Sequence, residues 1–130
     1  MYVNKIGNRL IKIEDEDLLL LLERYNIDNF EILNTANGEI AYRNKAICTL
    51  CKKYIKNDCI GCPFKQFESH IYDEVTYGCE NLLMMLVPTL SLDDIHHIED
   101  EIIFYESNGS RIKQSIQRIY NFFSNFKHVQ

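Results

Sequence analysis

Residues 48–64 of this 130-residue chain read CTLCKKYIKNDCIGCPF, and the rest of the fold has to be built around them. The stretch contains two Cys-x-x-Cys pairs, Cys48 with Cys51 and Cys59 with Cys62, separated by seven residues. Each pair can chelate an ion through a tight turn, and two pairs complete a tetrahedron. Thiolates exclude magnesium and calcium, and the spacing is not that of an iron–sulfur ferredoxin. The pattern therefore predicts one structural Zn²⁺ ion bound by these four cysteines.

A zinc ion with four thiolate ligands has no open position for water or substrate. The sequence contains no GxSxG, P-loop or GxGxxG motif. No histidine lies between residues 43 and 68, where an HNH-type nuclease would combine it with the cysteines. A thioredoxin-like redox protein would use one cysteine pair rather than two in succession. We therefore expect a protein that is not an enzyme, in which zinc holds the fold together.

The composition places the chain among ordinary globular proteins, with 46% hydrophobic and 25% charged residues. Its longest apolar run, residues 18–22, is far shorter than the roughly 20 residues of a membrane span. Residues 1–12 contain no apolar segment of the signal-peptide kind. Five cysteines, an odd number, argue against a disulfide framework in a chain without an export signal. We therefore expect a cytoplasmic protein in a reducing compartment.

The charge distribution leaves two interpretations of the cysteine region open. Residues 43–66 contain six basic side chains and one acid, a net +5 within a chain of net −5. A basic zinc module of this kind is one way to bind nucleic acid. Alternatively, the lysines offset the net −2 of four thiolates around Zn²⁺, and the region is a poor nucleic-acid binder. In the first interpretation the candidate contacts are Lys52, Lys53 and Lys56, with Tyr54 and Phe64 as stacking residues.

Local signals predict a mixture of strands and helices on both sides of the cysteines. Acids at residues 14–17 suit the positive end of a helix. Asn37-Gly38 between two apolar segments is a strong hairpin signal. Pro63 is favoured at the first position of a helix, which would place Cys62 at its N-cap. These patterns predict a strand over residues 10–13, a helix over 15–25, a hairpin with strands over 30–33 and 40–43, and helices over 64–72 and 78–87.

Two apolar seams at helical spacing predict an antiparallel helical hairpin over residues 91–126. A short linker at Asn108-Gly109 joins them. The first seam is Ile95, Ile98, Ile102 and Tyr105, and the second is Ile112, Ile116, Ile119, Phe123 and Phe126. Four apolar residues lie off these seams beside the acidic stretch 93–101. They form a candidate protein-docking surface or, in the alternative, close a second side of the core: Ile103, Phe104, Tyr120 and Phe122.

The cysteine motif also resembles a known group. The elements CxLCxxY and CxxCP, followed by Gly78-Cys79, resemble small cysteine-motif proteins of phages and prophages of low-GC Gram-positive bacteria. The resemblance covers about residues 47–79. It implies that Cys79 belongs to the zinc module. Cys79 would either lie next to the metal or be a ligand in place of one of the four cysteines. It also implies a phage-encoded protein that acts in the bacterial host cell.

Together these patterns predict a small single-domain α+β protein, mostly helical, spanning residues 1–130. Residues 1–47 would form a helix and a β-hairpin, residues 48–79 the zinc module, and residues 80–130 the helical hairpin. The function that fits best is a binding protein that docks on a protein partner, for example an inhibitor or regulator of a host defence machine. The alternative is a nucleic-acid-binding zinc module that acts as a regulator. Nothing in the sequence indicates a membrane or a small-molecule substrate.

Overall fold

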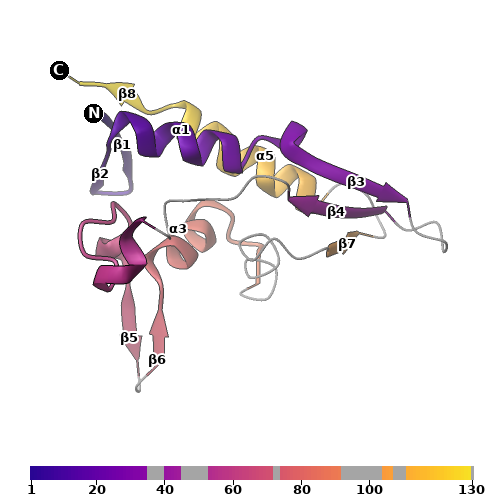
Figure 1. The fold of residues 1–130 in the computed structure, drawn as a ribbon. Coiled ribbons are helices and arrows are strands. Elements are labelled where there is room, and N and C mark those ends of the chain that lie inside the picture. The colour runs from indigo at the N-terminus through magenta and orange to yellow at the C-terminus, as the bar shows by residue number, and fades with distance from the viewer. Residues whose placement is uncertain (35–39, 45–52, 72–73, 92–103, 107–110, 130) are drawn as a thin grey trace.

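The computed structural model describes residues 1–34, 40–44, 53–71, 74–91, 104–106 and 111–129. Within these residues the chain forms three α-helices and three small antiparallel sheets (Figure 1). The helices are α1 (Asp15–Arg24), α3 (Gly78–Leu86) and α5 (Arg111–Ser124). The prediction of a small α+β fold is confirmed. None of the described helices has the length and apolar character that a membrane crossing requires.

The first sheet joins the two ends of the described chain. It contains β1 (Tyr2–Ile6), β2 (Arg9–Ile13) and β8 (Lys127–His128) in the order β2-β1-β8. Ile6 pairs with Arg9, so Gly7 and Asn8 form a two-residue turn, and Gly7 has a φ of 57° that glycine adopts without strain. The predicted strand over residues 10–13 is confirmed as part of β2. Its partners β1 and β8 were not predicted.

The second sheet contains the predicted hairpin and one strand at a position where the end of a helix was predicted. β3 (Phe30–Asn34), preceded by the 3₁₀ turn η1 (Ile27–Asn29), pairs with β4 (Ile40–Asn44), which confirms the hairpin. β7 (Phe104–Glu106) pairs with the other edge of β4. Tyr105 therefore lies in a strand, and its assignment to a helical seam is wrong. Phe104 and Tyr105 have high β propensity, and pairing satisfies the backbone groups of the β4 edge.

The other seam residues test the C-terminal hairpin only in part. Ile95, Ile98, Ile102, Asn108 and Gly109 lie outside the described residues. Ile112 lies in α5, but its side chain is not described. The remaining residues of the second seam are all buried, at 6% exposure or less: Ile116, Ile119, Phe123 and Phe126. These four residues of the second seam are therefore confirmed as part of the core, whereas the antiparallel partner helix stays a prediction.

The core lies where α1, α3 and α5 meet. α1 packs beside α5, and Tyr25 stacks on Phe123 with ring centroids 5.7 Å apart. α3 contributes Leu82 and Leu83, both 1% exposed. The predicted helices over residues 15–25 and 78–87 are confirmed as α1 and α3. The cysteine segment reaches this core through Phe64, whose ring lies 6.0 Å from that of Phe123.

Short turns and a small hairpin occupy the chain between the cysteines and α3. They are the 3₁₀ turns η2 (Ile55–Asn57) and η3 (Lys65–Phe67), and the strands β5 (Ser69–Ile71) and β6 (Glu74–Thr76). The predicted helix over residues 64–72 is wrong, and so is the helix N-cap at Cys62. Phe64 and Phe67 are both buried, and residues three apart point the same way in a 3₁₀ turn. The β5–β6 hairpin then extends away from the helices (Figure 1).

Candidate metal centre

The second cysteine pair lies on a tight turn with left-handed backbone. Asp58, Cys59 and Gly61 have φ values of 55°, 63° and 88°. The Cys62 amide donates to the Cys59 carbonyl at 3.0 Å, which closes the turn between the two cysteines. Positive φ costs an L-residue about 1–2 kcal/mol, and such strain persists where the surroundings impose it, often at functional sites. The backbone therefore has the tight form that chelation by a Cys-x-x-Cys pair requires.

Lys65 makes two hydrogen bonds to the backbone of this turn. Its amide donates to the Cys62 carbonyl at 3.1 Å, and its ammonium donates to the Asp58 carbonyl at 2.9 Å. The same ammonium forms an ion pair with Glu68. This pair raises the pKa of Lys65 and lowers the pKa of Glu68. Lys65 is therefore charged at neutral pH and holds the carbonyl before Cys59 in place.

The start of α3 is packed against the end of the cysteine turn. A Cβ atom built on Gly78 would lie 1.7 Å from the Phe64 carbonyl oxygen, so a side chain at this position is excluded. Asn81, one turn further along α3, donates to the Phe67 carbonyl at 2.7 Å. Cys79 follows Gly78 directly, and both Cys62 and Cys79 are partly buried against the core. The fold therefore places the fifth cysteine beside the segment that follows Cys62.

The remaining predicted ligands, Cys48 and Cys51, lie outside the described residues. Among the residues that the structure does describe, no group of three or more His, Cys, Asp or Glu side chains is arranged to hold a metal ion. The three described cysteines alone therefore do not make a site. Soft thiolates are nonetheless ligands that suit Zn²⁺, and a four-thiolate centre would need the first pair as well.

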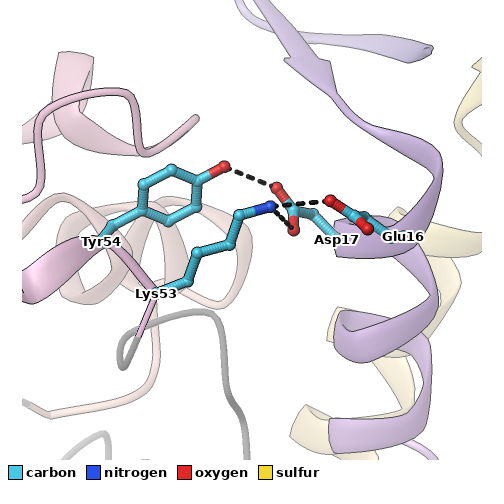
Figure 2. Close-up of polar contacts among 4 residues, drawn as sticks. All are labelled: Glu16, Asp17, Lys53 and Tyr54. Atoms are coloured by element: carbon cyan, nitrogen blue, oxygen red, sulfur yellow. Dashed lines mark hydrogen bonds and ion pairs between the residues drawn. The ribbon is translucent and has the colours of Figure 1, made fainter.

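A buried carboxylate connects the cysteine segment to α1. Asp17 is 1% exposed, and its Oδ2 accepts from the Tyr54 hydroxyl at 2.8 Å. Its Oδ1 accepts from Lys53 Nζ at 3.1 Å, and the same ammonium donates to Glu16 Oε1 at 2.9 Å (Figure 2). We call these four residues the Asp17 clamp. Because the buried charge is both paired and hydrogen-bonded, the clamp joins two segments that are far apart in the sequence.

The clamp changes how its members titrate. Burial raises the pKa of the Tyr54 phenol, and the hydrogen bond to Asp17 raises it further. Hydrogen bonds to Glu16 and Asp17 raise the pKa of Lys53. Both groups therefore stay protonated, as donors to Asp17, throughout the neutral range.

Comparison of the chain with known proteins gives no further information on this site. No family model, no curated protein and no solved structure matches the chain.

Most of the described candidate residues for nucleic-acid binding already make contacts within the protein. Lys53 is held by the clamp, and Tyr54 bonds to Asp17 while its ring lies against Gly61. Phe64 is 4% exposed, so its face is not available to stack on a base. Lys56 is exposed, and Lys52 lies outside the described residues.

Of the four candidate docking residues, two have described side chains and two do not. Tyr120 and Phe122 are partly buried and pack against the core. The Phe122 ring meets Phe123 and Phe126 edge-on, with centroids 5.4 Å away in each case. Ile103 lies outside the described residues, and Phe104 is described only as backbone in β7.

Sequence reasoning missed Asp17 as a site residue, because an acid in a first helical turn is explained by the helix dipole. A signal was available. Asp17, Leu21 and Arg24 are spaced by four and three residues, so they share one face of α1. All three are buried, with Asp17 and Arg24 each 1% exposed. Charged residues at the spacing of a buried leucine indicate that partners come from another segment.

Proposed function

We propose that this protein is a non-enzymatic binding protein, stapled by one zinc ion on Cys48, Cys51, Cys59 and Cys62, that docks on a protein partner. The left-handed turn from Asp58 to Cys62 is the observation that carries the metal assignment. Asp58 ends η2 in the left-handed form that is common at helix ends, whereas the positive φ of Cys59 directly after it is a further cost that metal binding would offset. With the ion, Cys59 and Cys62 would both be ligands, and coordination would offset the strain.

A protein partner is favoured over nucleic acid by where the charges and rings lie. Lys53 and Lys65 are paired with acids, and Phe64 is in the core. Phosphate binding needs several cations on one face that are not already neutralised. Exposed apolar side chains in the cysteine module fit a protein interface better, since contiguous apolar surface marks interaction sites. Those in the described part of the module are Ile55, Ile60, Ile71, Val75 and Tyr77, at 47–71% exposure.

Metal analysis of untagged protein tests the staple. We expect about one zinc per chain, and loss of zinc together with a large fall in melting temperature in Cys62→Ser. Coordination contributes folding free energy to the segment that it orders, so the loss of zinc lowers the melting temperature. Stoichiometric iron with sulfide, or a chain that holds no metal and melts unchanged in Cys62→Ser, would contradict the proposal.

Cys79→Ser is the matched control for that experiment. If Cys79 is a neighbour of the metal, this variant keeps about one zinc and its melting temperature falls less than that of Cys62→Ser. If the variant loses zinc, Cys79 is a ligand and one of the other four is not. Repeating the measurement with Cys59→Ser then identifies which cysteine of the second pair it replaces.

A further inference from the structure

We infer that Asp17 is a positioning residue for the cysteine centre, acting through Tyr54, and that it couples metal occupancy to the order of helix α1. The inference rests on the zinc staple proposed above. It adds a residue that is remote in sequence, contains no sulfur and does not itself bind the metal.

The first step of the argument joins Tyr54 to the cysteine turn. The Cys59 amide donates to the Tyr54 carbonyl at 2.9 Å. A Cβ atom on Gly61 would lie 3.5 Å from Tyr54 Cε1, so the ring lies directly against the middle of the turn. Backbone and ring of one residue therefore hold the segment between Cys59 and Cys62 from two directions.

The second step joins Tyr54 to α1. Its hydroxyl donates to Asp17, which is 1% exposed and lies in the first turn of that helix. The second donor to Asp17, Lys53, is the residue next to Tyr54, so both donors arrive on the same short segment (Figure 2). If this segment moves, the buried carboxylate loses both partners at once, which is strongly unfavourable.

The consequence is reciprocal. Ordering the turn with a metal ion fixes Tyr54 and Lys53 on Asp17 and so stabilises α1. Equally, an intact Asp17 pre-organises the turn and tightens metal binding by the same factor, because coupling between two equilibria has one value in both directions. Removing the Tyr54 hydroxyl should therefore weaken zinc binding even though all the thiolates remain.

The experiment measures zinc affinity of the full chain by competition with a chromogenic chelator. We expect Tyr54→Phe and Asp17→Asn to bind zinc about tenfold more weakly or worse, the factor that a hydrogen bond to a charged group corresponds to. Stoichiometry should stay near one, and the cobalt(II) spectrum should be unchanged, because the ligands are the same. Tyr2→Phe, which removes a hydroxyl outside the cysteine segment, should bind within about twofold of the wild type.

Hydrogen exchange gives the second readout, which a merely structural role would not move. Chelation of the wild type should speed exchange in residues 53–62 and also in residues 15–24. In Tyr54→Phe the chelator should still speed exchange in residues 53–62, but exchange in residues 15–24 should respond less to zinc than in the wild type, because only Lys53 still donates to Asp17.

Three results would overturn the inference. They are equal zinc affinity in Tyr54→Phe and the wild type, an α1 segment whose exchange ignores zinc, and global unfolding of the apo chain, in which case the coupling runs through the whole fold. In each of these the wild type still binds zinc, so the staple stands. A wild type that binds no metal removes the staple and the inference together. If Asp17→Asn does not fold, Tyr54→Phe alone decides.

Discussion

Gly78 lies against the Phe64 carbonyl at a point where the chain has no room for even one methyl group. Gly78→Ala would gain about 1 kcal/mol of helix propensity in α3. It must then move either a backbone carbonyl or the first turn of the helix, and overpacking of this kind costs about 1–3 kcal/mol or more. We expect a net loss of stability and weaker zinc binding, measured by denaturant unfolding and chelator competition.

Gly7→Ala is the matched control for this change. Gly7 has a positive φ but open space around it, so alanine there should cost only about 1–2 kcal/mol and leave zinc affinity unchanged. If Gly78→Ala is as stable as the wild type, the packing of α3 against the cysteine segment is looser than described here.

Tyr54 makes a prediction about alkaline pH. Its pKa is raised above the ordinary value of 10.0, first by burial and then by the Asp17 hydrogen bond. A group whose folded pKa lies above its unfolded value stabilises the fold fully below the unfolded value, and this contribution is lost as pH rises through the folded pKa. Lys53 acts in the same direction. The free energy of unfolding should therefore fall as pH rises above about 10, the ordinary pKa of a tyrosine.

The measurement is a series of urea unfolding curves across this range for the wild type and Tyr54→Phe. The variant should start less stable at neutral pH and lose less on going to alkaline pH, so that the two curves converge. Parallel curves would mean that Tyr54 titrates as it would in the unfolded chain.

At the scale of whole elements, α5 carries the clearest amphipathic pattern, and its partly buried residue Phe122 tests where the core ends. Its ring meets both Phe123 and Phe126. Phe122→Asp would bury a charge against these rings, and we expect it to destabilise the fold by about 3 kcal/mol or more. Asn121→Asp, at the exposed neighbouring position, should change stability by less than about 0.5 kcal/mol.

Thermal unfolding of the two variants settles whether this face of α5 belongs to the core. A folded Phe122→Asp with wild-type stability would return Phe122 to the candidate docking surface. The aspartate in the control adds the same charge to the same helix, so a shared effect would be electrostatic rather than a loss of packing.

Most elements with a local signal were predicted, among them α1, α3, α5 and the β3–β4 hairpin, whereas strands that pair with distant residues were not. The periodicity of α5 and the acids before α1 describe each helix from its own residues. β7 exists because β4 has an edge to pair with, and no residue near Tyr105 encodes that. The β1–β2 hairpin is a different kind of miss, because its Gly7-Asn8 turn between alternating apolar residues is a readable signal.

The residues of the cysteine site also differ in whether the sequence could predict them. The two Cys-x-x-Cys pairs predicted a metal from spacing alone, since chelation by a short turn is local chemistry. Asp17 could not be assigned to Tyr54, because the contact joins segments that only the folded chain brings together. Phe64 was read as a surface ring for the same reason. Its burial depends on Phe123 near the far end of the sequence.

At the scale of the whole molecule, the net charge of −5 is not offset by a free basic face in the described cysteine segment. Lys53 and Lys65 are paired with carboxylates. We expect no DNA or RNA binding tighter than about micromolar at near-physiological salt. A salt-titrated gel-shift assay measures this, with Lys56→Glu as the probe of the exposed lysine. Submicromolar binding that Lys56→Glu abolishes would favour the nucleic-acid module instead.

The β5–β6 hairpin lies between Phe67 and Gly78. Helix α3, which begins at Gly78, packs on η3, and its Asn81 side chain donates to the Phe67 carbonyl, so the two ends of the hairpin are held together. None of the described residues from Ser69 to Thr76 belongs to the hydrophobic core, so a change in the length of this hairpin would not disturb core packing. In the history of such a protein, this is the segment where insertions and deletions would accumulate without loss of the cysteine centre. A peptide tag or fluorophore grafted there would leave the cysteine turn in place, and it would test whether Ile71 and Val75 belong to the proposed interface.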